Sequence, residues 1–379
     1  AKRISDNLPM DMPITGDMGI TLQDVRDGKA TLEKFVDQLS IEEMAIIIRG
    51  EGMSNPRVTR GTASAFGGMS DSLFNYGIPA ACCADGPSGL RMEGKATQLP
   101  IGTALSATWN TELVRELYTM EGQELYRNQV DTLLGPGVNI RRNPLNGRNF
   151  EYFSEDPFLS GKMSVASTGG IKDGGAWGTI KHFALNGQES HRFKIDAVCS
   201  ERAIREIYLK SFEMAVKEKT VMSIMTSYNP INGHWAASNY DLCTTILRKE
   251  WGYKGFVMTD WWAKSNYEGH QAEVQVKAPM VAAQNDIYMV VSDAKSNPEN
   301  DDVEEMLHAG KITVGELQRN AANILGFLLK SPSVLLLTDR ICKEELEAMN
   351  TKAMTSVAVS HQTTGRNCFM RNFRFYKYR

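Results

Sequence analysis

The hydrophobic positions of this chain form two kinds of run that alternate along most of its length. Short, nearly continuous apolar runs, several of them rich in β-branched side chains, are typical of strands that are buried on both faces. Between most of these runs, apolar residues recur at every third or fourth position, which predicts amphipathic helices. Strands are expected at 79–84, 132–134, 177–180, 221–226, 256–258 and 286–291.

Capping residues mark where the expected helices begin. Ser40 and Glu43 have the spacing of a capping box, in which each side chain bonds a backbone N–H group of the other residue. Residues 51–75 are rich in glycine and serine and are expected to form a loop. Further helices are expected to begin at Asn110, Ser200 and Thr313, the last with Glu316 as its capping-box partner.

The alternation of strands and helices indicates a parallel sheet, and 379 residues suit an α/β fold of the (β/α)8 TIM-barrel type. Only six of the eight strands can be recognised, so closure is inferred and the barrel is expected to be imperfect. The barrel is assigned to residues 40–330. Residues 1–39 are interpreted as a connector, and residues 331–379 as an irregular tail with basic and aromatic side chains.

Polar and aromatic residues follow the C-terminal ends of five successive strands. Barrel enzymes carry their catalytic residues at this face. Any strand end needs turn residues, but a functional site explains a series of five better than turn formation does. In chain order the strand ends carry Asp85, a loop with Arg148 and Glu151, the pair Lys181 and His182, then Tyr228, and finally Asp260 with Trp261.

Asp260 is the first candidate for chemistry. It follows the end of the expected apolar strand 256–258 by two residues, and Trp261 and Trp262 come directly after it. A partly desolvated carboxylate beside flat aromatic surfaces suits the nucleophile of a glycosidase. Taken by itself, the same stretch is equally compatible with an aspartate that only caps the next turn.

The composition argues against several other classes of protein. A formal net charge of −3 gives no basic footprint for nucleic acid or for an anionic membrane. The six cysteines have no CxxC pair and no regular spacing, so neither a zinc site nor a disulfide framework is expected, and a cytoplasmic location is favoured. No membrane span and no secretory signal are recognised.

Five segments carry a resemblance to a known family. They are ADGPSGLR (84–91), IGTALSATWN (101–110), LLGPGVNIRRNPLNGRNFEYFSEDP (133–157), IKHFALNGQE (180–189) and GFVMTDWWA (255–263). Together they resemble glycoside hydrolase family 3, and most of all its bacterial β-glucosidases. The resemblance implies a retaining, exo-acting hydrolase that needs no cofactor or metal. Such an enzyme removes non-reducing terminal β-D-glucose, or also xylose, from oligosaccharides or aryl glycosides.

The resemblance also implies roles for the residues at the strand ends. Asp260 corresponds to the nucleophile that forms a covalent glycosyl-enzyme, and Trp261 to the aromatic residue that flanks the bound sugar. Tyr228 corresponds to a tyrosine close to the nucleophile. The ligands of the sugar hydroxyls are expected to be Asp85, Arg148, Lys181 and His182.

Other polar residues nearby are given lesser roles. Glu151 is expected to orient Arg148 and His182 from outside the reacting groups. Glu189 and His191 are interpreted as loop residues. The neighbouring pair Arg141 and Arg142 is left unassigned, because adjacent side chains cannot both face inward.

The general acid is missing from this pattern. Retaining hydrolysis uses two carboxyl groups about 5–5.5 Å apart. In the family's β-glucosidases the acid comes from a second α/β sandwich domain, which is not recognised here, and the resemblance favours members in which that domain precedes the barrel. The acid/base is therefore unassigned, and the alternative is a sugar-binding barrel fragment with little turnover. The family branch that uses a His/Asp pair is disfavoured, because Ala184–Gln188 replace its Gly-His-Gly-Asp run.

The expected partner is a β-glucoside or small oligosaccharide, with neither nucleic acid nor membrane. A homodimer is expected to cover apolar surface that a missing sandwich domain would expose. Residues 361–379 alternate basic with aromatic side chains, a pattern that suits single-stranded nucleic acid. An abnormal chain end is the favoured interpretation of this tail, since nothing upstream supports nucleic acid.

Overall fold

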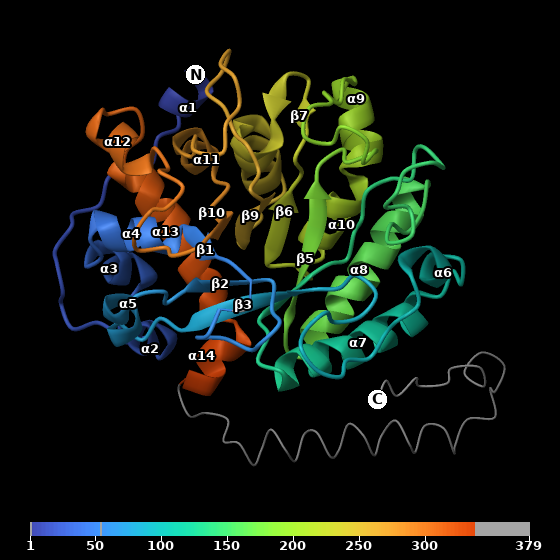
Figure 1. Cartoon of the computed structure of the whole chain (residues 1–379), viewed down its shortest axis with the longest axis horizontal. Helices are drawn as coiled ribbons and strands as arrows, with labels where there is room; N and C mark the ends of the chain where they lie inside the picture. Colours follow the sequence, from blue (N-terminus) through green and yellow to red (C-terminus); the bar gives the residue numbers. More distant parts are fainter. Residues whose placement is uncertain (1, 54, 338–379) are drawn as a thin grey trace.

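Eight strands close into a barrel in a computed structural model of the chain, which describes residues 2–53 and 55–337 (Figure 1). Strand β2 is antiparallel to both of its neighbours, whereas the other neighbouring strands are parallel. The expected α/β barrel is therefore confirmed, with one reversed strand. In order around the barrel the strands are β1 (Arg49–Glu51), β10 (Ile287–Val291), β9 (Phe256–Trp261), β6 (Ser223–Thr226), β5 (Trp177–Phe183), β4 (Thr132–Leu134), β3 (Ala80–Asp85) and β2 (Ser64–Gly67).

Helices surround the barrel, and a hairpin of β7 (Pro230–Ile231) and β8 (His234–Trp235) lies outside its sheet. The shorter α-helices are α1 (Lys2–Ser5), α2 (Leu22–Arg26), α3 (Leu32–Asp37), α4 (Ile41–Ile47), α5 (Asp71–Asn75), α6 (Gly102–Ser106), α9 (Glu201–Ala203), α10 (Lys210–Lys217), α11 (Ala278–Ala283), α12 (Val303–His308) and α14 (Pro332–Leu337). The long ones are α7 (Thr111–Arg127), α8 (Pro157–Asp173) and α13 (Val314–Leu328). Segments η1 (Ile204–Tyr208) and η3 (Asp241–Glu250) are π-helical, and η2 (Ala236–Ser238) is a 3₁₀ turn.

The predicted caps begin the predicted helices. Ser40 and Glu43 form a capping box at the start of α4, and Thr313 with Glu316 forms another at the start of α13. Asn110 accepts a hydrogen bond from the backbone N–H group of Leu113 in α7. These local signals are reliable because each cap bonds only within its own first turn.

The prediction of a loop over residues 51–75 was wrong, because β2 and α5 lie within it. The glycines that suggested a loop allow strands to approach closely. A Cβ atom on Gly68 would lie only 2.0 Å from the carbonyl oxygen of Ile78. Strand β1 was missed as well. It has three residues, and its Arg49 is buried by an ion pair with the distant Asp301.

Two clusters of buried side chains fill the space between the barrel and its helices. The first lies around β1, β2, β9 and β10, where Phe66, Phe256 and Phe327 form a ring cluster with centroids 4.7–6.1 Å apart. The second lies under α7, α8 and α10, where the rings of Phe183 and Phe212 are 5.1 Å apart. This packing holds the strand ends rigidly, which a precise site requires.

The segment expected to be a connector contributes to the first cluster, since Phe35 and Val36 of α3 are fully buried. The division of the chain at residue 40 stays a prediction. At the other end, α14 occupies the start of the expected irregular tail. Residues 338–379 lie outside the described part of the chain. Within the described residues, no helix has the length and apolar character needed to cross a membrane.

Candidate active site

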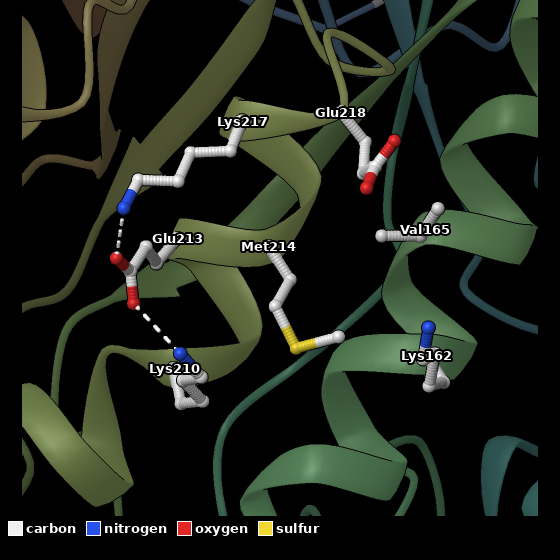
Figure 2. Close-up of a pocket in the computed structure, with 7 residues that line it drawn as sticks. All are labelled: Lys162, Val165, Lys210, Glu213, Met214, Lys217 and Glu218. Carbon is white, nitrogen blue, oxygen red and sulfur yellow. Dashed lines mark hydrogen bonds and ion pairs between the residues drawn. The ribbon is translucent and has the colours of Figure 1, made fainter.

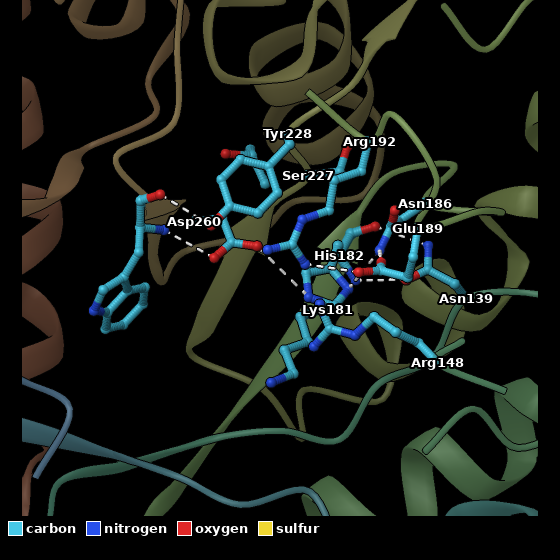
Figure 3. A network of polar contacts seen from close by, with 12 residues as sticks. Asn139, Arg148, Lys181, His182, Asn186, Glu189, Arg192, Ser227, Tyr228 and Asp260 are labelled. Atoms are coloured by element: carbon cyan, nitrogen blue, oxygen red, sulfur yellow. Dashed lines mark hydrogen bonds and ion pairs between the residues drawn. The ribbon is translucent and has the colours of Figure 1, made fainter. Parts of the chain in front are cut away.

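The expected site residues meet at one end of the barrel because the parallel strands β3, β5, β6 and β9 end on the same side. Asp85 is the last residue of β3, and Lys181 and His182 lie near the end of β5. Tyr228 follows β6 by two residues, and Asp260 is the penultimate residue of β9. Parallel strands in register thus bring together side chains that are far apart in sequence (Figure 3).

The Asp260 carboxylate is almost fully buried, with 8% of the residue exposed. Its Oδ1 atom accepts a hydrogen bond of 2.8 Å from the backbone N–H group of Trp261. Burial raises the pKa of Asp260, against the lowering effects of this hydrogen bond and of the charges on Arg148 and Lys181. A desolvated carboxylate that still has positive charges nearby is suited to nucleophilic attack.

His182 lies beside Asp260, with Nε2 3.7 Å from Oδ2 of the carboxylate. Burial lowers the pKa of His182 well below its usual range, and the charges on Arg148, Lys181 and Arg192 lower it further. The imidazole is therefore neutral at neutral pH, and the contact is not an ion pair despite its geometry. Asn139 fixes the backbone of His182 through two hydrogen bonds, of 2.7 and 2.9 Å.

Lys181, Asp85, Arg148 and Glu151 form a charged cluster next to this pair. The Nζ atom of Lys181 lies 3.6 Å from Oδ1 of Asp85 and 4.0 Å from Oε2 of Glu151. Burial alone would raise the pKa of Asp85, but the charges on Lys181 and Arg91 hold it below its ordinary value. Glu151 accepts a hydrogen bond from Nε of Arg148, while its Oε2 atom is buried with no hydrogen-bond partner.

Tyr228 connects the end of β6 to the end of β9, since its hydroxyl donates a 2.9 Å hydrogen bond to the carbonyl oxygen of Trp261. Burial and the negative charge of Asp260 raise the pKa of Tyr228, so the phenol stays protonated. The indole of Trp261 is partly buried against the first core cluster. Its neighbour Trp262 has φ 54° and is 49% exposed. The strand therefore ends by turning one indole toward the core and the other toward solvent.

Four further residues belong to this network that sequence reasoning did not place in it. Glu151, which was expected to orient both Arg148 and His182, contacts Arg148 and also Lys181, whereas the His182 ring bonds Tyr152. The available signal was a polar run after the second predicted strand, which contains Tyr152, and another after the third, but runs of polar residues are also typical of loops. The four residues are Tyr152, Asn186, Glu189 and Arg192.

A hollow on the outer helix layer, between α8 and α10, is separate from this site (Figure 2). Lys210 and Lys217 both bind the carboxylate of Glu213 there, at 3.2 and 2.5 Å. Two of its three lysines are thus paired with Glu213, and the third, Lys162, lies over the ring of Phe158, so the hollow offers little for a ligand. Over residues 2–53 and 55–337, no cluster of three or more His, Cys, Asp or Glu side chains could hold a metal ion.

A closed α/β barrel with a buried carboxylate, a neutral histidine and cationic side chains at its strand ends is an architecture that suits glycoside hydrolysis. The sequence profile of the glycosyl hydrolase family 3 N terminal domain matches residues 22–326. The chain belongs to this family, as its motifs predicted.

Individual relatives agree with this assignment. The chain is 53% identical over 326 residues to a β-glucosidase from Ruminococcus albus, a match that covers 86% of this chain and 34% of that protein. A β-glucosidase structure from Paenibacillus barengoltzii superposes with a TM-score of 0.87 at 62% identity, covering 88% of this chain and 37% of that one. β-Glucosidase 3B from Thermotoga neapolitana in complex with α-D-glucose gives 0.72 at 36% identity, covering 81% and 44%. The chain thus spans about a third of the length of the first two relatives.

Proposed function

We propose that this barrel is the part of an exo-acting, retaining β-glucosidase that binds the sugar and supplies the nucleophile, Asp260. One observation carries the proposal: the buried carboxylate of Asp260 faces the ring of His182, with its Oδ1 atom held by a backbone N–H group. The similarity of the chain to β-glucosidases from two bacteria supports glucose as the sugar.

The chemistry of the first step follows from these groups. An oxygen of Asp260 attacks the anomeric carbon, the bond to the leaving-group oxygen breaks, and the leaving group departs with the bonding electrons. Positive charge that develops on the sugar ring is stabilised by the ionised carboxylate. Asp85 accepts hydrogen bonds from sugar hydroxyls, and Lys181, Arg148 and His182 donate to their oxygens. Water then releases glucose with overall retention.

The general acid remains unassigned among the carboxyl groups of the site. Asp85 is a poor candidate because neighbouring cations lower its pKa. Glu151 is held as an ion-pair partner of Arg148. We propose that the acid comes from a residue outside this network or from another chain. The alternative function, a sugar-binding barrel with little turnover, predicts that no substrate is cleaved.

A comparison of two substrates tests the proposal. A 2,4-dinitrophenyl β-glucoside has a leaving group that needs no proton, so the barrel should cleave it even without an acid, whereas it should fail on cellobiose. The Asp260→Gly variant should lose this cleavage, and azide should restore it with inverted product. Cleavage that is unchanged in Asp260→Gly would refute the nucleophile assignment. Glucose binding without cleavage of either substrate would favour the alternative.

The finer points of substrate, location and assembly are proposals as well. Rates of hydrolysis of an aryl β-glucoside and of the matched aryl β-xyloside would show whether the site accepts glucose alone or both sugars.

The unpaired thiols of Cys82, Cys83, Cys199 and Cys243 support a reducing, cytoplasmic location. A homodimer would cover exposed apolar side chains such as Trp109 and Leu145, which are 76% and 89% exposed. Sedimentation velocity tests this assembly.

A further inference from the structure

The loop after β5 carries an ion pair that none of the roles above uses. The guanidinium of Arg192 lies 2.7 Å from Oε2 of Glu189, and both side chains are only partly exposed. The other carboxylate oxygen of Glu189 accepts a 3.0 Å hydrogen bond from Nδ2 of Asn186. The pair therefore reaches inward to a buried amide rather than ending in solvent (Figure 3).

The ion pair fixes which way the Asn186 amide points. An ionised carboxylate can only accept hydrogen bonds, so the group that faces Glu189 must be the NH₂ end of the amide. The same NH₂ group donates its second proton to the hydroxyl of Tyr152, at 3.0 Å. Both protons of the Asn186 amide are then used, and the Tyr152 oxygen accepts one of these two hydrogen bonds.

The Tyr152 hydroxyl must then donate its own proton elsewhere. Tyr152 is fully buried, and Nδ1 of His182 lies 3.1 Å from its oxygen. If Nδ1 carried the proton instead, the buried hydroxyl would accept twice and donate to nothing along this chain, which is costly. Nδ1 of His182 is therefore the acceptor, and in a neutral imidazole the proton resides on Nε2.

The Nε2 atom is the one that faces Asp260, 3.7 Å from its carboxylate. A second set of contacts leads from the same arginine to the same carboxylate. The guanidinium of Arg192 lies 4.7 Å above the ring of Tyr228. The Tyr228 hydroxyl donates a hydrogen bond to the carbonyl oxygen of Trp261. The backbone N–H group of Trp261 in turn donates to the carboxylate of Asp260. Two separate sets of contacts thus link the loop to the Asp260 carboxylate, one through His182 and one through Tyr228.

We propose that Glu189 and Arg192 are positioning residues that set the tautomer of His182, so that its Nε2–H group points at the nucleophile and the sugar it attacks. This inference rests on the proposed function for its catalytic meaning, but the tautomer is a property of the free protein. The relay runs from Arg192 through Glu189, Asn186 and Tyr152 to the ring.

The tautomer can be measured directly by ¹⁵N-detected long-range correlation spectra of protein labelled at histidine, because protonated and unprotonated ring nitrogens have well-separated shifts. His182→Asn identifies the signals of this ring. We expect a protonated Nε2 in the wild-type chain and in Arg192→Lys, which keeps a cation beside Glu189. Glu189→Met should move part of the population to the Nδ1-protonated form. Tyr152→Phe should do the same, and it provides a second variant if Glu189→Met does not fold.

Kinetics give an independent readout. With 2,4-dinitrophenyl 2-deoxy-2-fluoro-β-D-glucoside, the rate constant for dinitrophenol release should fall about 10-fold or more in Glu189→Met, with a smaller change in the dissociation constant, as expected for a misoriented group. The amount released measures the active fraction and separates this effect from misfolding. Arg202→Met, which removes an exposed arginine–glutamate pair on the helix surface, is the matched control and should behave as wild type.

The two proposals fail in different ways. A wild-type chain that releases no dinitrophenol and gains no label on Asp260 would refute the proposed function. A wild-type His182 with its proton on Nδ1 would overturn the relay, whatever the activity. The relay would also be overturned if, in Glu189→Met, the ¹⁵N chemical shifts of the His182 ring and the rate constant for dinitrophenol release both matched the wild-type values.

Discussion

The Nε2 atom of His182, on β5, lies 3.7 Å from Oδ2 of Asp260, on β9. The two strands are not neighbours, because β6 lies between them in the barrel. The distance is longer than a hydrogen bond, and the neutral imidazole makes no ion pair with the carboxylate. Sites without substrate commonly show such long contacts, which tighten when substrate binds. The two side chains are therefore held close together without neutralising the Asp260 carboxylate.

Removing the hydroxyl of Tyr228 should weaken catalysis without unfolding the site. The hydroxyl donates a 2.9 Å hydrogen bond to the carbonyl oxygen of Trp261, the residue that follows the proposed nucleophile Asp260. In Tyr228→Phe we expect kcat on an aryl β-glucoside to fall about 10-fold, a loss typical for a group that orients a reacting residue. Tyr208→Phe, on the surface segment η1, serves as the control. Equal activity of the two variants would contradict this role.

The pH profile should report the charges around Asp260. Only the ionised carboxylate can attack, so activity falls as the pH drops through its pKa, which burial raises above the ordinary value. The groups that face it are Arg148, Lys181, His182 and Tyr228. Because the charge of Lys181 lowers this pKa, Lys181→Met should shift the acid limb of kcat/KM to higher pH. The control Lys162→Met, in the outer hollow, should leave the acid limb of kcat/KM at its wild-type pH. An acid limb that also stays at the wild-type pH in Lys181→Met would contradict this role of the Lys181 charge.

The buried carboxylate of Asp260 should also reduce stability at neutral pH. A carboxyl group whose pKa is raised in the folded state favours folding below its unfolded pKa, and this contribution is lost as the pH rises through the folded pKa. The neutral Asp260→Asn variant avoids that loss, so its Tm should exceed that of the wild type at pH 7. The two values should converge below about pH 4, where both side chains are neutral. A Tm difference that is constant with pH would contradict the assignment of this cost to ionisation.

Barrel closure should depend on a buried ion pair. Arg49 of β1 contacts Asp301 at 2.7 Å, and both side chains are almost completely buried. Arg49→Met leaves the Asp301 carboxylate without its cation, which should reduce the free energy of unfolding by about 3–5 kcal/mol in urea titrations. The double variant Arg49→Met with Asp301→Asn should recover part of the loss.

The exposed pair of Arg60 and Glu93 gives the comparison. Arg60→Met should cost less than about 1 kcal/mol, because solvent screens an exposed pair. If the Arg49 and Arg60 variants lost the same free energy, the buried pair would have no special part in closing the barrel.

The alternation of strands and helices, the capping residues and the family could all be predicted from the amino-acid sequence alone. These features are local: Ser40 and Glu43 bond within one turn, and the buried strand β9 begins with a run of apolar residues at 256–258. The sequence also predicted the residues that the strand ends bring together, because parallel strands must end on one side. Asp85, Lys181, His182, Tyr228 and Asp260 could all be found in this way.

The contacts that those residues make, in contrast, become known only from the folded chain. Arg49 looks like a surface residue in the sequence, and its burial depends on Asp301, about 250 positions away. The orientation of His182 depends on Tyr152 and on Glu189, which lie on different loops. No pattern of hydrophobicity records such pairs, because hydrogen bonds between distant segments are set by how the barrel closes. The residues of the site can thus be predicted from the sequence, whereas their protonation states and the orientations of their side chains depend on the fold.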